Sequence, residues 1–286
     1  MPSLIDIRRR IRSVKNTQQI TKAMKMVSAA KLRRAQERVI AARPYAALLK
    51  EMMSDLAAAA ASDENAGSSP LLTVRPEKRI QLILVTSDTG LAGAFNSNLI
   101  KAALTFLGEH KDAITEMVAI GRKGRDAFRK RGVTITSEHL QLVQKAQYSD
   151  AAEIAKSAIK RFVDGEIDSI YLLNNDFKSV VAQKVTVTKL LPVTLPEQKE
   201  PVDFIFEQPA LEMLQNLLPR YLEVEIFRSL LETFAAYHAA RMTAMDSASS
   251  NAKEMIESLT LNMNRVRQAS ITREIIEVVS GASAAE

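Results

Sequence analysis

The chain has 286 residues, of which 47% are hydrophobic and 25% are charged, and its net charge is +6. It contains no cysteine, which excludes disulfides and thiolate metal sites, and its three histidines (His110, His139 and His238) lie too far apart in sequence to suggest a metal cluster. No apolar run approaches the ~20 residues of a membrane-spanning helix, and the start of the chain lacks the apolar stretch of a signal peptide. We therefore expect a soluble chain that is not exported, with one large or two small domains and neither a metal nor a cofactor.

Residues 3–58 have the pattern of one long helix. Apolar or small side chains recur at alternating steps of three and four, as in the seam of a coiled coil. The seam begins apolar and becomes polar: Leu4, Ile7, Ile11, Val14, Gln18, Thr21, Lys25, Ser28, Leu32, Ala35, Val39 and Ala42. At ~1.5 Å per residue such a helix is about 84 Å long, well beyond the ~30 Å diameter of a small domain. Pro44, which follows Arg43, predicts a kink.

The same segment is strongly basic. Residues 1–43 hold 12 Lys or Arg but only two acids, Asp6 and Glu37, and the stretch ITKAMKMVSAAKLRRAQ (20–36) holds no acid. A basic arm of this kind is typical of a contact with nucleic acid or with an acidic protein, and the alternative is a merely solvated face. Since the whole chain carries only +6, the remainder is slightly acidic.

The middle of the chain alternates between strand and helix patterns after a linker at 57–70 that is rich in Ala, Ser and Gly. The predicted strands are 79–87, 116–121, 132–136, 168–175 and 180–193, and the predicted helices between them are 95–110, 122–131 and 149–163. This alternation predicts a small Rossmann-like α/β domain with a largely parallel sheet. The last strand alternates apolar and polar residues, which is typical of a strand with one exposed face.

Residues 210–279 return to a helical pattern, with a second seam that again steps by four and three. Its members are Phe227, Leu231, Phe234, His238, Arg241, Met245, Ala248, Ala252, Met255, Leu259, Asn262, Val266, Ala269, Arg273 and Ile276. Two long helices at the two ends of one chain are expected to pair antiparallel around the α/β domain. The predicted division is a first helix at 1–60, a linker at 61–76, the α/β domain at 77–208 and a second helix at 209–286.

Sites for chemistry are weak in this sequence. TSDTGLAGAFNSN (86–98) follows a strand and opens a helix, and Gly90 and Gly93 are free to adopt positive φ. One interpretation of this segment is a cradle of backbone amides for an anion. The segment lacks both the G-x-G-x-x-G pattern and the lysine of a P-loop, and a tight structural turn is the better interpretation. The same holds for GRKGRD (121–126). Ser87 and Asp88 have no neighbouring base in a G-x-S-x-G elbow, so we predict no catalytic residue.

Polar residues interrupt both seams: Gln18, Lys25 and Ser28 on the first helix, and His238, Arg241 and Asn262 on the second. A permanent coiled coil prefers apolar residues at these positions. We expect His238 to be a packing residue. The pair of helices therefore needs stabilisation from elsewhere, and a sleeve of other subunits around it is one way to supply that.

Five ordered stretches resemble the gamma subunits of the F-type ATP synthases, and the resemblance covers essentially the whole chain. They are NTQQITKAMKMVSAAKLRRAQ (16–36), SDTGLAGAFN (87–96), NNDFKSVVAQ (174–183), HAARMTAMDSASSNA (238–252) and RQASITREIIEVVSGASA (267–284). The last contains the signature of that family, here Ile271, Thr272, Glu274, Glu277, Gly281 and Ala282. Where that family often has Arg and Cys in the second stretch, this chain has Thr89 and Ala92.

The resemblance implies a non-catalytic rotor shaft of two antiparallel helices inside a ring of three alpha and three beta subunits (3:3:1), with the nucleotide sites in the ring. By similarity, Met24 and Lys25 face an acidic beta loop, and Arg241, Gln268, Thr272 and Glu274 are tied to coupling within the ring. The foot is implied to meet the epsilon subunit and the membrane c ring. Its implied contact residues are Arg38, Arg43, Tyr45, Phe204 and Glu207. The implied location is the cytoplasmic side of the bacterial inner membrane, as a peripheral protein.

Two other classes of protein stay open from the residues alone. A basic coiled-coil protein that binds nucleic acid would explain the arm, although the arm has no aromatic residue for base stacking before Tyr45. A stand-alone nucleotide-binding enzyme would explain the glycine-containing turns. The absence of cysteine excludes thiol regulation of the kind found in some plant and cyanobacterial members of the resembled family.

Overall fold

The computed structural model describes residues 3–60, 69–142, 146–180, 182–194 and 208–283. It divides into two compact units. The helix unit combines Met1–Ser28 with Arg241–Glu286, and the sheet unit comprises Ala29–Ala240. Each unit therefore contains a stretch of both terminal helices.

The sheet unit is built on five strands: β1 (Arg79–Val85), β2 (Ile114–Ile120), β3 (Ile135–His139), β4 (Ser169–Phe177) and β5 (Gln183–Leu191). Their order in the sheet is β3-β2-β1-β4-β5. The first four are parallel to their neighbours, and β5 runs antiparallel to β4 at the edge. The central strand β1 is buried at six of its seven positions, which explains why RIQLILV is nearly continuous in apolar residues. The predicted, largely parallel α/β sheet is confirmed.

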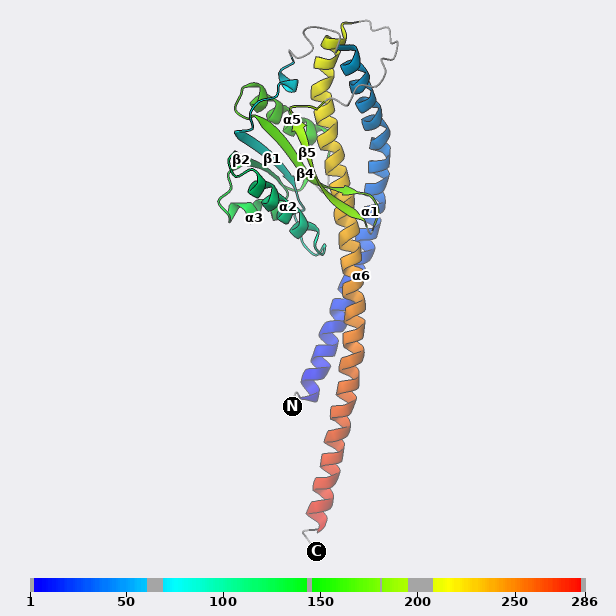
Figure 1. Ribbon diagram of the computed structural model, residues 1–286. Helices are drawn as coiled ribbons and strands as arrows, with labels where there is room; N and C mark the ends of the chain where they lie inside the picture. Colours follow the sequence, from blue (N-terminus) through cyan, green and yellow to red (C-terminus); the bar gives the residue numbers. More distant parts are fainter. Residues whose placement is uncertain (1–2, 61–68, 143–145, 181, 195–207, 284–286) are drawn as a thin grey trace. The chain divides into compact units, whose positions relative to one another are not determined.

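Three helices cover the sheet: α2 (Phe95–Glu109), α3 (Arg122–Arg129) and α5 (Tyr148–Val163). A short 3₁₀ turn, η2, spans Pro70–Leu72. The chain steps in one direction from β1 to β3 through α2 and α3, then returns across β1 to reach β4 through α5. Because such crossovers are right-handed, α2 and α3 lie on one face and α5 on the other (Figure 1).

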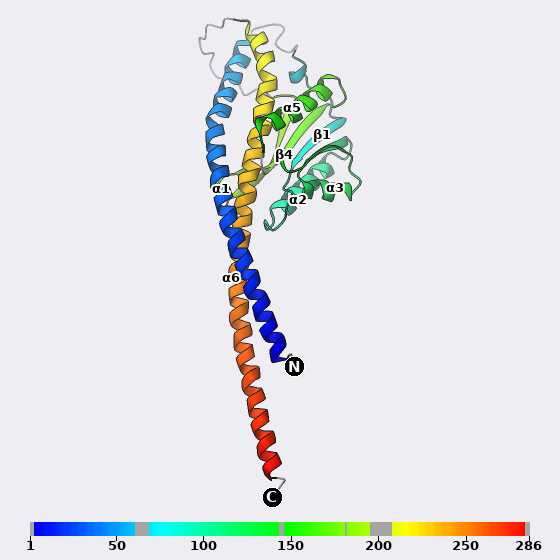
Figure 2. The same ribbon diagram turned by 180° about the vertical axis from the view of Figure 1, so that it is seen from behind.

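The two long terminal helices have the predicted extent. α1 covers Leu4–Ala60 and continues through Pro44, and α6 covers Ala210–Ser283 and continues through Pro219. Within the sheet unit the predicted first seam is buried, since Leu32, Ala35 and Val39 expose 4% or less. Further along, Ala46, Leu49 and Val224 form a buried cluster with Leu217 and Tyr221 packed against it. In both views α1 and α6 run side by side in this unit (Figure 2).

The glycine-containing turns are held by the chain's own hydrogen bonds. The Asp88 carboxylate accepts from the backbone N–H of Arg122 at 3.1 Å and of Gln141 at 3.1 Å. Ser87 donates through its N–H and its hydroxyl to Asn96 Oδ1. The expectation of positive φ is wrong for Gly90: Leu91 (φ 63°) and Gly93 (φ 55°) make the turn instead.

Gly121 and Gly124 are required by close approach to Thr86 rather than by an anion. A Cβ at Gly121 would lie 2.2 Å from the carbonyl oxygen of Thr86, and Gly121 has φ 91°. The N–H of Gly124 donates to Thr86 Oγ1 at 2.8 Å. The second glycine-containing segment is therefore a structural turn at Gly121 that leads directly into α3.

Candidate protein interface on the terminal helices

Within the helix unit, α1 and α6 pair antiparallel. Gln18 Nε2 donates to the carbonyl oxygen of Ser249 at 3.5 Å, and Lys25 Nζ lies 2.6 Å from Asp246 Oδ1. The partner number falls as the α1 number rises, which is the antiparallel order. Ile7, Thr21 and Ser28, all predicted seam residues of α1, are buried.

The predicted seam of α6 is correct up to Ala252 and then partly wrong in register. Met255 is 52% exposed, and Asn262, Ala269, Arg273 and Ile276 are exposed as well. The half-buried positions after Ala252 are Ile256, Leu259, Thr260, Met263, Asn264, Val266 and Ser270. The predicted and the observed positions both include Ala252, Leu259 and Val266, which are spaced by seven residues. Between them, the prediction places a seam residue three positions after each, and the structure places it four positions after each. The observed positions are Ile256 and Met263, which are at least as apolar as the predicted Met255 and Asn262.

The polar centre of this pairing is only weakly stabilising by itself. The Lys25 and Asp246 side chains are 41% and 60% exposed, so their ion pair contributes only ~0.2–1 kcal/mol. They line a polar groove of about 350 Å³ together with Gln18, Gln19, Lys22 and Ser249. The groove offers hydrogen-bonding groups rather than an apolar seal.

Beyond the paired region, the end of α6 is apolar and uncovered. All residues from 271 to 280 are exposed. Five of them are large and aliphatic: Ile271 (48%), Ile275 (57%), Ile276 (59%), Val278 (72%) and Val279 (59%). An exposed apolar stripe of this kind on a helix marks a protein contact.

The other helix of the pair, α1, presents positive charge. Six exposed cations precede Lys25 on α1, namely Arg8, Arg9, Arg10, Arg12, Lys15 and Lys22. No ion pair joins any of them to a carboxylate in the part of the chain that the structure describes. The helix unit thus combines an apolar end with unopposed cations, and both features suit a surrounding partner that is apolar in one place and acidic in another.

The residues assigned to the ring by resemblance all lie in the helix unit. Met24, Lys25 and Arg241 are half-buried, whereas Gln268, Thr272 and Glu274 are exposed. The Thr272 hydroxyl donates to the carbonyl oxygen of Gln268 at 2.9 Å, and Ser270 donates to Glu274 Oε1 at 3.3 Å. These bonds connect residues one helical turn apart, so the exposed side chains remain on the outer surface of α6.

The residues assigned to the foot lie in the sheet unit or outside the described residues. Arg38 Nη2 donates to the carbonyl oxygen of Ala146, and Arg43 Nη2 donates to that of Phe177 at 3.1 Å. Both guanidinium groups therefore link α1 to the α/β layer. Tyr45 is 60% exposed. The predicted contacts at 204 and 207 lie outside the described residues.

A charged cluster that sequence reasoning missed lies on α6 beside Asp176 of β4. Arg228 donates to Glu225 Oε2 at 2.8 Å and to Glu232 Oε1 at 3.0 Å. Burial raises the pKa of Glu232, Arg228 opposes this effect, and nearby Asp176 on β4 reinforces it. The spacing of the three α6 residues, i, i+3 and i+7, was the available signal, since it places them on one helix face.

No group of three or more metal-ligating side chains occurs in the described ranges. Among the same residues, none of the helices combines the length and the apolar character needed to cross a bilayer.

This chain is of the class in which a doubly wound α/β domain is inserted between two long helices. The two helices pair antiparallel and carry an open contact surface. The family model described as ATP synthase matches residues 3–285. The ATP synthase gamma chain of Solibacter usitatus is 64% identical over 286 residues, with all of both chains covered. That of Desulfitobacterium hafniense is 49% identical, again over the full length of both. This chain belongs to the gamma-chain family of the ATP synthases.

Solved structures agree with this assignment. A chain in the central stalk and c-ring structure of the Tetrahymena thermophila mitochondrial ATP synthase is 25% identical, with a TM-score of 0.62 over 80% of this chain and 99% of that one. A chain of the Euglena gracilis mitochondrial enzyme shares the fold, with a TM-score of 0.70, 16% identity and coverage of 98% and 94%.

Proposed function

We propose that this chain is the central-stalk gamma subunit of a bacterial F-type ATP synthase, and that it couples rotation of the c ring to ATP synthesis in a ring of three alpha and three beta subunits. In this role it supplies no catalytic residue and acts as the rotating shaft. The complex attaches it to the cytoplasmic face of the inner membrane as a peripheral protein. Its foot contacts epsilon and the c ring, through Arg38, Arg43, Tyr45, Phe204 and Glu207.

The uncovered apolar end of α6 is the observation that carries this proposal. Five large aliphatic side chains between 271 and 279 are 48–72% exposed in the isolated chain. Exposing this much aliphatic surface is unfavourable, and burying each such side chain fully contributes ~1.5–3 kcal/mol. At ~100° per residue these five positions form one broad stripe on α6, so a partner must cover at least that face, and a ring of subunits around the helix would do so.

The charges of α1 support the same arrangement. Acidic loops of the beta subunits that pass the unopposed cations in turn would be attracted to each without forming a permanent pair. Met24 and Lys25 are proposed to meet these loops, and Arg241, Gln268, Thr272 and Glu274 to make the coupling contacts on α6. Small and flexible side chains at the contact favour sliding over a locked fit.

Because the chain has no cysteine, a single introduced cysteine tests this directly. Val278→Cys places a thiol on the apolar end, and Val74→Cys, at a position that is 79% exposed in the sheet unit, is the matched control. Each variant is co-expressed with alpha and beta subunits and labelled with a maleimide. We expect a 3:3:1 complex in which Cys labelling at 278 is slow and labelling at 74 stays fast.

Failure to co-purify with alpha and beta, or equal labelling rates at both positions within the complex, would contradict the proposal. Salt-sensitive binding of DNA by the purified chain, in place of complex formation, would instead favour a nucleic-acid-binding role.

A further inference from the structure

The sheet of the α/β domain has a topological switch point between β1 and β4. From β1 the chain proceeds to β2 and β3 on one side, and it then returns to the other side of β1 to form β4. In doubly wound sheets, ligands bind in the crevice outside the carboxyl ends of the strands that flank such a point. Here that edge carries the turn at 86–94, which follows β1, and the last residues of β4. A ligand of the α/β domain is therefore expected in this crevice.

Side chains of α6 occupy the crevice. The pairing of β4 with β1 ends at Leu173, so Asn175 lies beyond the end of β1. The backbone N–H of Asn175 donates to Thr233 Oγ1 at 3.4 Å. One helical turn further along α6, the hydroxyl oxygen of Tyr237 lies 2.5 Å from Thr89 Oγ1, in the turn that follows β1. Thr233 and Tyr237 thus contact the ends of both strands that flank the switch point.

Tyr237 is enclosed in the way that a bound aromatic ligand would be. It is only 2% exposed, and a buried tyrosine hydroxyl normally has a hydrogen-bond partner, which Thr89 supplies. Phe95, at the start of α2, packs edge-to-face on the Tyr237 ring, with the two ring centroids 5.6 Å apart and the ring planes at 66°. Phe95 is itself 3% exposed. The contact therefore combines a polar group for the phenol oxygen with an aromatic wall for the ring.

The same crevice is unsuited to a phosphate. Residues 86–96 include no Lys or Arg, and Asp88 is the one charged residue among them. Asp88 is 8% exposed, and its carboxylate accepts from the backbone N–H groups of Arg122 and Gln141. A phosphate would approach this carboxylate and would have to displace Tyr237. The chemistry of the turn therefore favours an uncharged phenol over an anion.

We propose that the turn at 86–96 is the docking site for α6, with Tyr237 as its ligand and with Thr89 and Phe95 as positioning residues. The crevice that binds a ligand in other doubly wound sheets is filled here by a side chain of the same protein. Docking at this point holds the α/β domain on α6, so that the domain and this part of the helix move as one body. The inference does not depend on the proposed function.

Truncation of Tyr237 leaves a site for a free phenol. The test uses full-length Tyr237→Ala with p-cresol as the analogue of the tyrosine side chain, toluene as the analogue without the hydroxyl, and ADP and inorganic phosphate as anionic probes. Hydrogen exchange of the amides at 86–96, followed by mass spectrometry, reports how firmly the turn is held. We expect faster exchange than in wild type, which p-cresol at about ten times its Kd slows by ~10-fold. Toluene should slow exchange less, because it cannot bond to Thr89 Oγ1.

Matched comparisons make the result specific. p-Cresol should leave exchange unchanged in wild type, where Tyr237 fills the crevice, and in Tyr45→Ala, which truncates a tyrosine that is 60% exposed. Thr89→Val and Tyr237→Phe remove only the two hydroxyls and provide a second test if Tyr237→Ala folds poorly. Each should speed exchange of the turn by ~2–10-fold, as loss of one hydrogen bond implies, and the double variant should add little to either change.

Additive effects of Thr89→Val and Tyr237→Phe on exchange would overturn the proposal. So would slower exchange of Tyr237→Ala with ADP or phosphate in preference to p-cresol, or equal slowing by toluene and p-cresol.

Discussion

Two glycines with positive φ provide a matched test of how the turn at 121–126 is built. Gly121 has φ 91° and ψ 144°, a region that is almost exclusive to glycine, and its added Cβ would lie 2.2 Å from the carbonyl oxygen of Thr86. Gly132 has φ 72°, but a Cβ there would meet nothing within 4 Å. Gly132→Ala therefore carries only backbone strain, whereas Gly121→Ala carries strain and a clash with backbone.

The expected magnitudes follow from those two situations. Backbone strain at positive φ costs ~1–2 kcal/mol for an alanine. The clash at Gly121 requires a backbone shift, and overpacking of that kind costs a further ~1–3 kcal/mol. We expect the free energy of unfolding to fall by ~1–2 kcal/mol in Gly132→Ala and by ~2–5 kcal/mol in Gly121→Ala.

Urea unfolding monitored by tyrosine fluorescence measures the difference in unfolding free energy between the two variants, because the tyrosines report on the sheet unit that contains both glycines. The chain has no tryptophan and five tyrosines, all of which lie between residues 29 and 240 in the sheet unit. Equal destabilisation by the two substitutions, or a smaller loss in Gly121→Ala, would refute the argument from close approach to Thr86.

Three further predictions concern charge. Met24→Lys should leave assembly intact but lower the number of protons pumped per ATP in membrane vesicles, because an ion pair of ~1–3 kcal/mol with a passing acidic loop deepens one rotary position; pumping equal to wild type would contradict this. A double-mutant cycle on Lys25 and Asp246 should give a coupling of ~0.2–1 kcal/mol that shrinks as salt is added, and a larger, salt-independent value would show that the pair is not exposed. Burial raises the pKa of Glu232 above its ordinary value of 4.5 in the folded state. The folded state therefore binds this proton more tightly than the unfolded state does. The resulting stabilisation is fully present below pH 4.5 and is lost as the pH rises through the pKa of the folded state. Wild type should therefore lose stability relative to Glu232→Gln as the pH increases above about 4.5, and a constant difference would argue against burial as the cause.

The helices and strands of this fold can be predicted from the sequence because each has a long or unambiguous hydrophobic pattern. The two terminal helices and four of the five strands lie close to their predicted positions, whereas β3 spans Ile135–His139 and not the predicted 132–136. Which side chains of α6 belong to the seam beyond Ala252 is less well determined by the sequence. Met255 and Ile256 are both apolar, so steps of three and four fit almost equally well, and packing against α1 decides between them.

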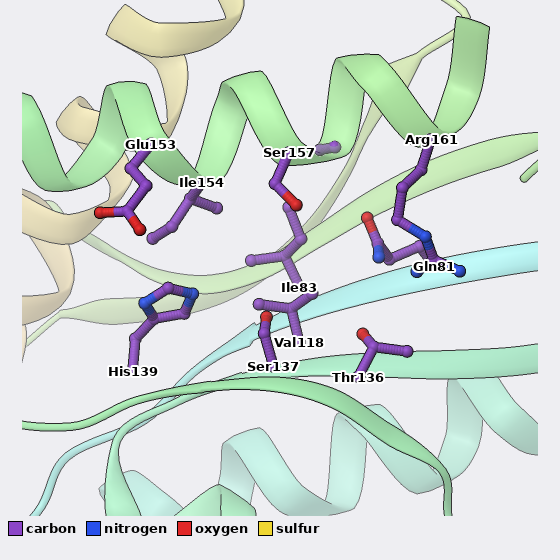
Figure 3. A pocket seen from close by; sticks show the side chains of 11 residues that line it. Gln81, Ile83, Val118, Thr136, Ser137, His139, Glu153, Ile154, Ser157 and Arg161 are labelled. Atoms are coloured by element: carbon purple, nitrogen blue, oxygen red, sulfur yellow. The ribbon is translucent and has the colours of Figure 1, made fainter. Parts of the chain in front are cut away.

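The missed features depend on contacts between residues that are distant in sequence. No local pattern shows that Leu91 rather than Gly90 takes positive φ, because the backbone N–H groups of Arg122 and Gln141, which are distant in sequence, donate to Asp88 and help to hold the turn. The resemblance assigns Arg38 only to the implied foot, and the fold alone shows that its guanidinium donates to the carbonyl oxygen of Ala146. The pocket between α5 and the strands could not be predicted for the same reason, since Gln81 and Arg161, which both line it, come from elements that are distant in sequence (Figure 3).

Rotation observed in single complexes tests the central claim most directly. Lys111→Cys places a unique thiol at an exposed position of the sheet unit in an otherwise cysteine-free chain. A bead attached to this thiol, in a complex whose alpha and beta subunits are fixed to a surface, should rotate in one direction when ATP is added and pause at three angles per turn, as a ring of three alpha–beta pairs requires. A bead that stays fixed while the complex hydrolyses ATP would contradict the role of this chain as the rotating shaft.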